Sequence, residues 1–297
     1  MFLKPKSPYS YPPPRRTSYI AIAIPSSITL TEETLYLKTI KVGIIARAAA
    51  IHRVDEIIVY NDRSEALHET KIIVDVLKYL RTPPYLRKKI IPLKKTLKYA
   101  GILPPLQTPN HPQQAMLRQG EIREGLVEKL GKKYAQVDVG AKKLVKVKRR
   151  GNIKVGDIVY VRILDESSFL GEIVDENSVK YYLCFKISTC SSFKELFKRK
   201  WDFKIATSRY GRKVNEVLDL IKRVISRKSK VLIAFGAPKE GLYEIASRHG
   251  LNVEKIFDIV INTIPYQGVQ VIRTEEAIHA TLELISLLEA NFADLVQ

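Results

Sequence analysis

Short apolar runs alternate with helix-like segments along most of this 297-residue chain, and this alternation most constrains its fold. Tyr19–Ile24 and Ile57–Tyr60 each have the length and apolar character of a buried strand. Apolar residues at helical spacing follow both runs, within 35–49 and 72–80. Strands that alternate with helices predict a parallel sheet in an α/β domain.

A different pattern interrupts this alternation in the middle of the chain. Five short strands with turn residues between them suggest a small β-barrel, for which the OB-fold is the natural candidate. The expected strands are Gly125–Leu130, Tyr134–Val139, Lys142–Lys148, Asp157–Leu164 and Leu170–Asp175.

The strand–helix pattern resumes after the barrel. We expect strands at 181–187, 203–206, 231–235 and 257–261, and helices at 213–225, 241–249 and 275–289. The predicted organisation is therefore a discontinuous α/β domain (17–106 and 181–297) with an inserted OB-like domain at 107–180. Residues 1–16 hold five prolines and predict a flexible tail.

Two helix starts have a hydroxyl residue followed by two glutamates. Thr31 has this pattern before the first helix, and Thr274 has it before the last. Such residues cap helix N-termini and complement the helix dipole. For Thr274 and Glu275 we therefore prefer a capping role over catalysis.

The positive charge is clustered. The chain carries 50 Lys and Arg against 31 Asp and Glu, a formal net charge of +19. Residues 87–150 hold 17 of the cations and 4 acids, and residues 194–230 hold 13 cations and 4 acids. A single Lys-rich run is often only a solvated face, but two concentrated runs favour a nucleic-acid partner.

Composition argues against other classes of protein. No apolar run approaches the roughly 18 residues of a membrane span, and the first residues lack the apolar core of a secretory signal. The two cysteines, Cys184 and Cys190, are too few for a zinc site and are expected to be small apolar residues of a cytoplasmic protein. We expect no metal.

Three loops that follow strands in the second half are candidates for the active site, because ligands of parallel sheets bind beyond the carboxyl ends of strands. The loops are Ala206–Arg209, Phe235–Leu242 and Ile261–Gly268, the last continuing to Glu276. Gly236 and Gly241 have the spacing of a P-loop, but Leu242 and Tyr243 stand where a P-loop needs Lys and Ser or Thr. No G-x-G-x-x-G motif follows a strand either, so a glycine turn remains that lets the backbone approach a flat ligand.

These loops resemble the SPOUT superfamily of trefoil-knotted methyltransferases, in its archaeal and eukaryotic branch of RNA methyltransferases with an inserted OB-like domain. The resemblance covers nearly everything after Arg16. It is carried by 205–208, 235–236, 260–268 and 271–277, with earlier matches at 43–49, 84–88, 100–106 and 123–126. The run from Asn262 to Ala277 is its most specific part, and Ala237 and Tyr266 depart from it because relatives often have glycine there.

The resemblance implies a knotted parallel-sheet domain that binds S-adenosylmethionine in its knotted loops and forms a homodimer. It places the following residues in the cofactor pocket: Thr207, Ser208, Arg209, Phe235, Gly236, Ala237, Asn262, Thr263, Ile264, Gln267, Ile272 and Thr274.

Arg47 and Arg273 are the candidates for catalysis, since a guanidinium orients a phosphate or a base by bidentate contacts. Arg47 stands within a stretch of alanines, where an interface or an internal ion pair would explain it equally well.

The insert is expected to grip RNA, because aromatic rings among cations stack unpaired bases while the cations follow the backbone. For any single tyrosine, packing in the barrel is the better explanation. The candidates are Lys88, Lys89, Lys132, Lys133, Tyr134, Lys146, Arg149 and Tyr160.

By resemblance we expect methylation of ribosomal RNA, with N-methylation of a pyrimidine as an option. The alternative is a non-catalytic RNA-binding factor for ribosome assembly that kept the knotted fold. A methyltransferase for basic proteins fits a +19 chain poorly, and no helix-turn-helix or zinc motif supports DNA binding.

Overall fold

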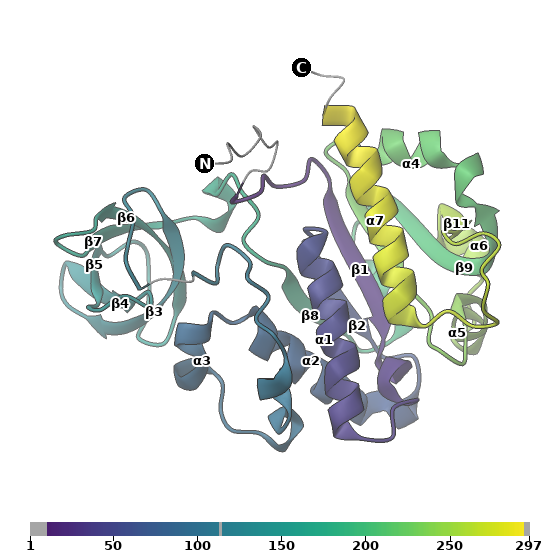
Figure 1. Ribbon diagram of the computed structural model, residues 1–297, viewed down its shortest axis with the longest axis horizontal. Coiled ribbons are helices and arrows are strands. Elements are labelled where there is room, and N and C mark those ends of the chain that lie inside the picture. Colours follow the sequence, from purple (N-terminus) through teal and green to yellow (C-terminus); the bar gives the residue numbers. More distant parts are fainter. Residues whose placement is uncertain (1–10, 113–114, 294–297) are drawn as a thin grey trace, which may run out of the picture. The chain divides into compact units, whose positions relative to one another are not determined.

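The computed structural model describes residues 11–112 and 115–293, which form two compact units. The larger unit contains residues 16–81, 93–106 and the described residues from 185 onward, and holds a parallel sheet. The smaller unit contains residues 82–92 and 107–184 with residues 11–15, and holds a closed β-barrel (Figure 1). The predicted α/β fold with a parallel sheet and a separate small barrel is confirmed.

The larger unit is built on a six-stranded sheet in the order β11-β9-β10-β1-β2-β8, and all neighbouring strands pair in parallel. Its strands are β1 (Tyr19–Pro25), β2 (Glu56–Tyr60), β8 (Lys186–Cys190), β9 (Phe203–Lys213), β10 (Lys230–Ala234) and β11 (Ile259–Asn262). The central strand β1 is buried from Ile20 to its end, as its unbroken apolar sequence requires of a parallel strand covered on both faces.

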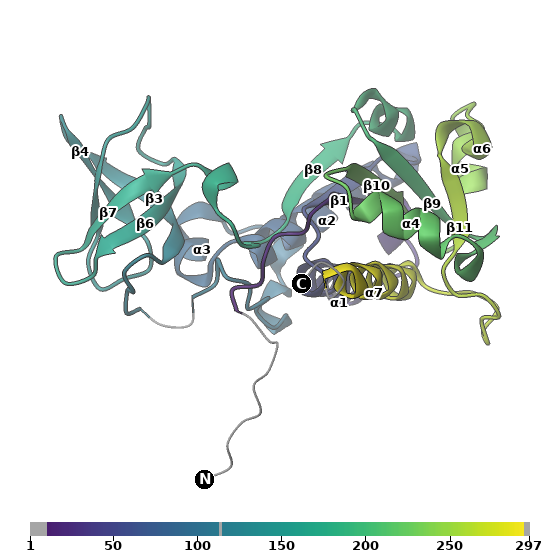
Figure 2. The same ribbon diagram turned by 90° about the horizontal axis from the view of Figure 1, so that it is seen from above.

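Helices cover both faces of this sheet, and α1 and α7 lie side by side on one of them (Figures 1 and 2). The helices are α1 (Leu35–Ile51), α2 (Leu67–Arg81), α4 (Leu218–Ile225), α5 (Leu242–Arg248), α6 (Val253–Ile256) and α7 (Thr274–Ala293). Short 3₁₀ turns stand at η1 (Ser26–Thr29), η2 (Ser64–Ala66), η3 (Lys95–Leu97), η4 (Ala100–Ile102), η6 (Phe193–Lys198) and η7 (Val214–Glu216).

The first helix begins three residues later than predicted. The side chain of Thr34, not that of Thr31, accepts the hydrogen bond from the backbone N–H of Leu37, at 3.2 Å. Glu32 instead forms an ion pair of 2.7 Å with the buried Lys41 of α1. The expectation was wrong because either threonine can cap a helix. The acids after Thr31 made it the better candidate, but Glu32 binds Lys41 instead of the helix start.

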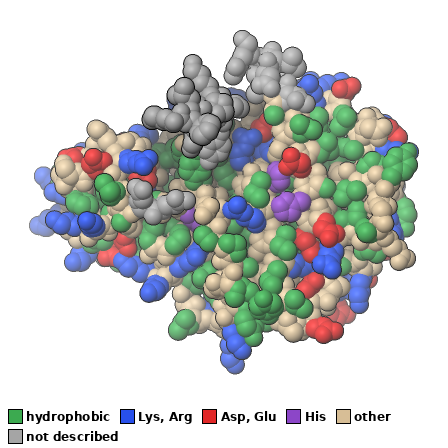
Figure 3. Space-filling model, viewed as in Figure 1, with side chains coloured by type: hydrophobic (Ala, Val, Ile, Leu, Met, Phe, Trp, Pro, Cys, Tyr) green, Lys and Arg blue, Asp and Glu red, His purple; other side chains and the backbone are tan. Residues whose placement is uncertain are grey.

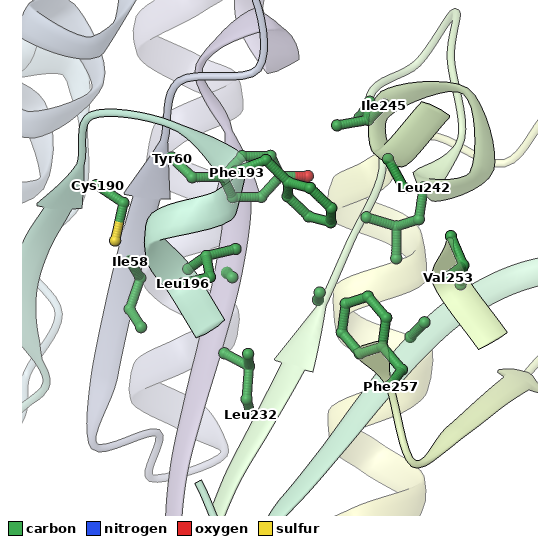
Figure 4. Packing of buried hydrophobic residues seen from close by; sticks show 14 of the residues in the cluster. Ile58, Tyr60, Cys190, Phe193, Leu196, Leu232, Leu242, Ile245, Val253 and Phe257 are labelled. Carbon is green, nitrogen blue, oxygen red and sulfur yellow. The ribbon is translucent and has the colours of Figure 1, made fainter. Parts of the chain in front are cut away.

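An aromatic cluster packs against the sheet beside α5 and α6 (Figure 4). Tyr60 from β2 meets Phe193 from η6, with ring centroids 5.1 Å apart. Phe193 also lies 6.4 Å from Phe257, which follows α6. The cluster holds the end of β2 near the loop after β10, where the cavity described below lies.

Strand β9 is longer than predicted and has an irregular register with β11. Val260 pairs with Ala206, but the next residue, Ile261, pairs with Arg212. Residues 207–211 of β9 therefore have no partner in β11 and form a wide bulge, which we call the β9 excursion. The predicted helix over 213–225 is correspondingly shorter, because Lys213 still belongs to β9 and α4 begins at Leu218.

The strand predicted at 181–187 is displaced. The strand that pairs with β2 is β8, which begins at Lys186. Tyr181 instead forms an isolated antiparallel bridge with Pro14. The apolar residues Leu183 and Phe185 are buried without belonging to a strand, so apolarity alone gave the wrong boundary.

The barrel has the five strands that the sequence predicts, with shifted ends. They are β3 (Ile122–Leu130), β4 (Tyr134–Asp138), β5 (Val145–Lys148), β6 (Ile158–Asp165) and β7 (Leu170–Val174). The order is β3-β4-β5-β7-β6, closed by the pairing of β3 with β6, and β5 runs parallel to β7. Valines fill its interior, for example Val137, Val147 and Val161, all fully buried.

The same unit contains α3 (Pro84–Ile90) and the 3₁₀ turn η5 (Glu176–Ser178). The ring of Tyr85 on α3 fills the space beside Gly140, and its hydroxyl donates to the carbonyl of Glu124 at 2.5 Å. Residues 11–15 are also part of this unit, where the backbone N–H of Tyr182 donates to the carbonyl of Pro13. The predicted tail falls mainly on residues 1–10, outside the described residues.

Within residues 11–112 and 115–293, no helix is both long and apolar enough to cross a membrane. The same residues contain no group of three or more His, Cys, Asp or Glu side chains that could hold a metal ion.

Candidate functional site

An open cavity of about 450 Å³ lies in the larger unit, beyond the carboxyl ends of β10 and β11. All three loops that the sequence singles out line it. Its walls contain every one of the twelve predicted cofactor residues: Thr207, Ser208, Arg209, Phe235, Gly236, Ala237, Asn262, Thr263, Ile264, Gln267, Ile272 and Thr274.

The turn after β10 is fixed by three hydroxyl groups from three different elements. The carbonyl of Ala234 accepts from Thr207 at 2.9 Å, that of Phe235 from Tyr60 at 2.7 Å, and that of Gly236 from Thr274 at 3.0 Å. These bonds satisfy consecutive backbone acceptors that would otherwise be costly to bury. The turn is thus held rigidly at the floor of the cavity.

Gly236 lets this turn close on itself. A Cβ at this position would lie 2.9 Å from the Cα of Gly241 and 3.1 Å from the carbonyl oxygen of Glu240. The backbone N–H of Ala237 donates to the same carbonyl at 2.8 Å. The glycine is required by close backbone approach within the turn. The predicted approach of this backbone to a flat ligand stays a prediction.

The loop after β11 is tied to the excursion of β9. The side-chain amide of Asn262 donates to the carbonyl of Arg209 at 3.1 Å, and its oxygen accepts from the backbone N–H of Ile264 at 3.0 Å. Arg209 in turn donates to the carbonyl of Gln270 at 3.4 Å. Gln267 closes its own turn by donating to the carbonyl of Val269 at 2.7 Å.

Thr274 and Glu275 do not cap the last helix. Thr274 donates its hydroxyl to Gly236, and the buried Glu275 lies 3.7 Å from the ammonium group of Lys41. The side chain of Glu276 takes the capping role instead, by accepting from the backbone N–H of Arg273 at 2.8 Å. The predicted cap at Thr274 was wrong because its hydroxyl turns toward another element, whereas Glu275 and Glu276 stand in the first turn of α7, as the sequence predicts.

Charge in the cavity is mixed. Arg209 and Lys239 line it together with Glu240 and Glu244. A hydrogen bond from Arg248, reinforced by Arg63 at 2.7 Å, lowers the pKa of Glu240. Glu240 is therefore ionised near neutral pH and cannot serve there as a proton donor.

Two tyrosines near the cavity stay neutral at physiological pH. Burial raises the pKa of Tyr60 well above its usual value, and the nearby Asp62 adds to this effect. Burial together with a hydrogen bond to Glu254 raises the pKa of Tyr243 to about 12. Neither phenol is placed to act as a base.

Several lining residues escaped the sequence analysis. They are Tyr210, Tyr243 and Glu244. Tyr210 directly follows a loop that the sequence singled out, and its position next to Arg209 was the available signal. Tyr60 gave no signal, because the hydroxyl of a buried tyrosine usually finds a hydrogen-bond partner but the sequence does not show which one.

Arg47 and Arg273 lie outside the cavity lining. Arg47 is exposed on α1, and its guanidinium donates to the carbonyl of Leu106 at 2.7 Å. Arg273 is also exposed, between the lining residues Ile272 and Thr274. Their catalytic roles stay predictions.

Most predicted RNA contacts lie on one exposed face of the barrel. Tyr134 on β4 is 43% exposed, and the ammonium group of Lys146 on β5 lies 4.2 Å from its ring centre. Lys132 and Lys133 occupy the adjoining turn, and Arg149 follows β5. Lys and Arg side chains gather over these strands in Figure 3.

The other three candidates differ from this group. Lys88 is exposed on α3, whereas Lys89 is paired with Asp138 at 2.5 Å and with Glu128. Tyr160 packs beside a small apolar cluster at one end of the barrel, and its hydroxyl donates to Glu124 at 3.1 Å. For Tyr160 the structure favours the packing explanation.

A protein family described as "Putative RNA methyltransferase" matches residues 19–285. The chain belongs to this family. The chain is 30% identical over 282 residues to an uncharacterized protein of Haloarcula marismortui, and the match covers 91% of this chain and 99% of that protein.

Two animal proteins that are similar to the chain are named "28S rRNA (uridine-N(3))-methyltransferase". The Drosophila melanogaster protein is 30% identical over 93% of this chain and 64% of its own length. The human protein is 29% identical over 89% of this chain and 76% of its own length. The chain is accordingly a methyltransferase by family.

Proposed function

We propose that the protein transfers a methyl group from S-adenosylmethionine to N3 of a uridine in ribosomal RNA, which releases S-adenosylhomocysteine and the N3 proton. The observation that carries this proposal is the meeting of all three candidate loops around one cavity at the carboxyl edge of the sheet, in a chain of this family. The names of the animal relatives support the choice of base and atom.

The residues of the cavity fit this cofactor. A volume of about 450 Å³ lies within the roughly 300–1,000 Å³ typical of small-molecule sites. Phe235, Ile264 and Ile272 supply apolar surface for a purine, while main-chain groups and the side chains of Asn262 and Thr263 offer hydrogen bonds. When bound, the cofactor supplies an electrophilic methyl group, and the chain supplies its position; alignment of reactants alone contributes about 7–11 kcal/mol in favourable cases.

The trefoil knot belongs to the same proposal. The excursion of β9 over residues 207–211 is consistent with a threaded chain, because Gly211 lies so close to Ile261 that a Cβ would meet its backbone atoms at 2.6–2.8 Å. This contact brings the β9 excursion directly against strand β11.

The barrel is proposed to be an OB-like RNA-binding domain. Its strand order, with the first strand paired to the fourth and the third parallel to the fifth, supports this assignment. OB-folds bind oligonucleotides on the face of their second and third strands, which here carries Tyr134 and Lys146. Lys132 and Lys133 flank this face, in the turn between the first two strands.

A homodimer is proposed through α1 and α7. Leu37, Ile44 and Ile51 recur every seven residues on α1 and are 40–52% exposed, and Leu287 of α7 is 56% exposed. Figure 3 shows hydrophobic side chains on this face of the molecule. In this arrangement Arg47, on the same helix, would lie at the interface and could orient RNA from there; Arg273, next to the cavity, is proposed to orient the acceptor.

Light scattering tests the dimer. Ile44→Asp should convert a dimer at micromolar concentration into a monomer, while Leu93→Asp, a change at a fully exposed leucine, should not. A monomeric wild-type protein would reject the interface.

The decisive experiment for function is labelled methyl transfer onto RNA from a strain that lacks the protein, followed by mass analysis of nucleosides. We expect label in ribosomal RNA as N3-methyluridine. Calorimetry with S-adenosylmethionine distinguishes the outcomes. Binding without transfer, or no binding at all, would support the alternative of a ribosome-assembly factor and reject the enzyme.

A further inference from the structure

Two exposed tyrosines belong to the loops that form the cavity, and each lies beside a cation. Tyr210 lines the cavity on the β9 excursion and is 68% exposed. Tyr266 belongs to the loop after β11, between the lining residues Ile264 and Gln267, and is 86% exposed. Rings that leave so much apolar surface in water contribute little to folding.

The cations hold both rings without covering them fully. The guanidinium carbon of Arg209 lies 5.0 Å from the ring centre of Tyr210. The ammonium group of Lys213 donates to the hydroxyl of Tyr266 at 2.7 Å and lies 4.7 Å from its ring centre. Lys213 therefore sits toward the hydroxyl end of the ring, so a broad face of Tyr266 stays open to a flat ligand.

The backbone at Tyr266 is in the left-handed region, with a φ of 63°. A residue with a bulky side chain rarely adopts this conformation, and glycine adopts it freely. The loop therefore has a strained tyrosine at a position where glycine would adopt the same backbone conformation without strain. The tyrosine ring is exposed and does not contribute to the core. Strain of this kind is concentrated at ligand sites.

The two loops that carry these rings are joined to one another. Asn262 donates to the carbonyl of Arg209, and Arg209 donates to the carbonyl of Gln270. These bonds connect the chain next to Tyr210 with the loop that contains Tyr266, on the rim of the same cavity.

We propose that Tyr210 and Tyr266 form the stacking subsite for the acceptor base, which enters as an unstacked nucleobase of single-stranded RNA. Stacking on aromatic rings recognises unpaired bases, and a base in a duplex cannot present its face in this way. Arg209 and Lys213 supply positive charge for the adjoining phosphates. This inference rests on the proposed function and names the form of RNA that its site accepts.

A binding experiment tests the subsite without requiring turnover. The probe is a hexauridylate with one central 2-aminopurine, whose fluorescence reports stacking, titrated into full-length protein with saturating S-adenosylhomocysteine. All proteins carry Tyr134→Leu, so that the exposed barrel face contributes less to binding.

Tyr210→Leu and Tyr266→Leu should each weaken probe affinity by about 5- to 150-fold, the range measured when an aromatic stacking partner is removed. Tyr266→Phe should keep most of the affinity, and Tyr36→Leu, at another exposed tyrosine that does not line the cavity, should keep all of it. Tyr266→Gly relieves the left-handed backbone and should behave like Tyr266→Leu, which excludes misfolding as the cause.

Unchanged probe affinity in both leucine variants would overturn the proposal. So would a parallel loss of S-adenosylhomocysteine affinity, since the rings would then support the cofactor loops. A wild-type protein that binds and quenches the probe but transfers no methyl group would leave this subsite intact and reject the proposed function instead.

Discussion

Gly211→Ala should separate two backbone segments that touch beside the cavity. A Cβ at residue 211 would lie 2.6 Å from the carbonyl carbon, 2.7 Å from the nitrogen and 2.8 Å from the Cα of Ile261. Contacts under 3.0 Å essentially never occur for real Cβ atoms, and backbone atoms cannot turn aside as a flexible side chain does. The β9 excursion and β11 must therefore move apart by several tenths of an ångström.

The cost of such overpacking is about 1–3 kcal/mol. For a domain of this size, each kcal/mol lowers the melting temperature by about 2–4 °C, so we expect a loss of about 2–12 °C. Because Asn262 follows Ile261 and bonds Arg209, the displacement also opens a wall of the cavity. Calorimetric affinity for S-adenosylhomocysteine should fall by at least about tenfold, which corresponds to roughly 1.4 kcal/mol.

Gly268→Ala is the matched control, because a Cβ there meets nothing within 4 Å. It should change neither melting temperature nor affinity. If Gly211→Ala melts within 1 °C of the wild type and binds the cofactor product equally well, the close approach of β9 to β11 is not a constraint on this site, and the argument fails.

Three further predictions follow from contacts in the two units. Thr274→Val removes the hydroxyl that holds the carbonyl of Gly236 and should cost about 1–3 kcal/mol of cofactor affinity by calorimetry, whereas an affinity equal to that of the wild type would contradict the role of this bond. Burial lowers the pKa of His52 to about 4, below its unfolded value of 6.5. The neutral His52 therefore contributes fully to the free energy of unfolding above pH 6.5, and up to about 3 kcal/mol of this contribution is lost as the pH falls toward 4. Urea unfolding should show a smaller loss of stability between pH 7.5 and 4.5 in His52→Gln than in the wild type, and equal losses would refute this reasoning. Lys146→Ala should weaken RNA binding and reduce the slope of log affinity against log salt by about 1, while an unaltered slope would place the phosphate contacts elsewhere.

Much of the fold was predictable because local patterns and tertiary structure agree. The unbroken apolar run of β1 and the alternating valines of the barrel each determine burial by themselves. The start of α1 was not predictable, since Thr31 and Thr34 are equivalent as caps until Lys41 binds Glu32. The length of β9 was underestimated because the polar residues after Ala206 are typical of a loop, although Arg212 and Lys213 pair with β11.

The sequence predicts the loops of the candidate site, but not the side chains from other elements that hold these loops in place. The loops follow strands, and the strands end at one edge of the sheet. The hydroxyl of Tyr60 comes from a strand that contributes nothing else to the turn, so only the folded chain reveals its bond to Phe235. The sequence shows Tyr266 where relatives often have glycine, but its strained backbone and exposed ring appear only in the folded chain.

The three hydrogen bonds that hold the turn after β10 come from parts of the chain that are synthesised at different times. Tyr60, Thr207 and Thr274 enter the chain during synthesis as widely separated residues, and the segment from Ile261 to Ala277 is made after every other wall of the cavity. Until that segment docks, the carbonyl of Gly236 lacks its hydroxyl partner and the cavity lacks one side. A nascent chain therefore completes the walls of the cavity only when its last segment has been made, so we expect an incomplete translation product to bind no ligand there even when most of its sheet has formed.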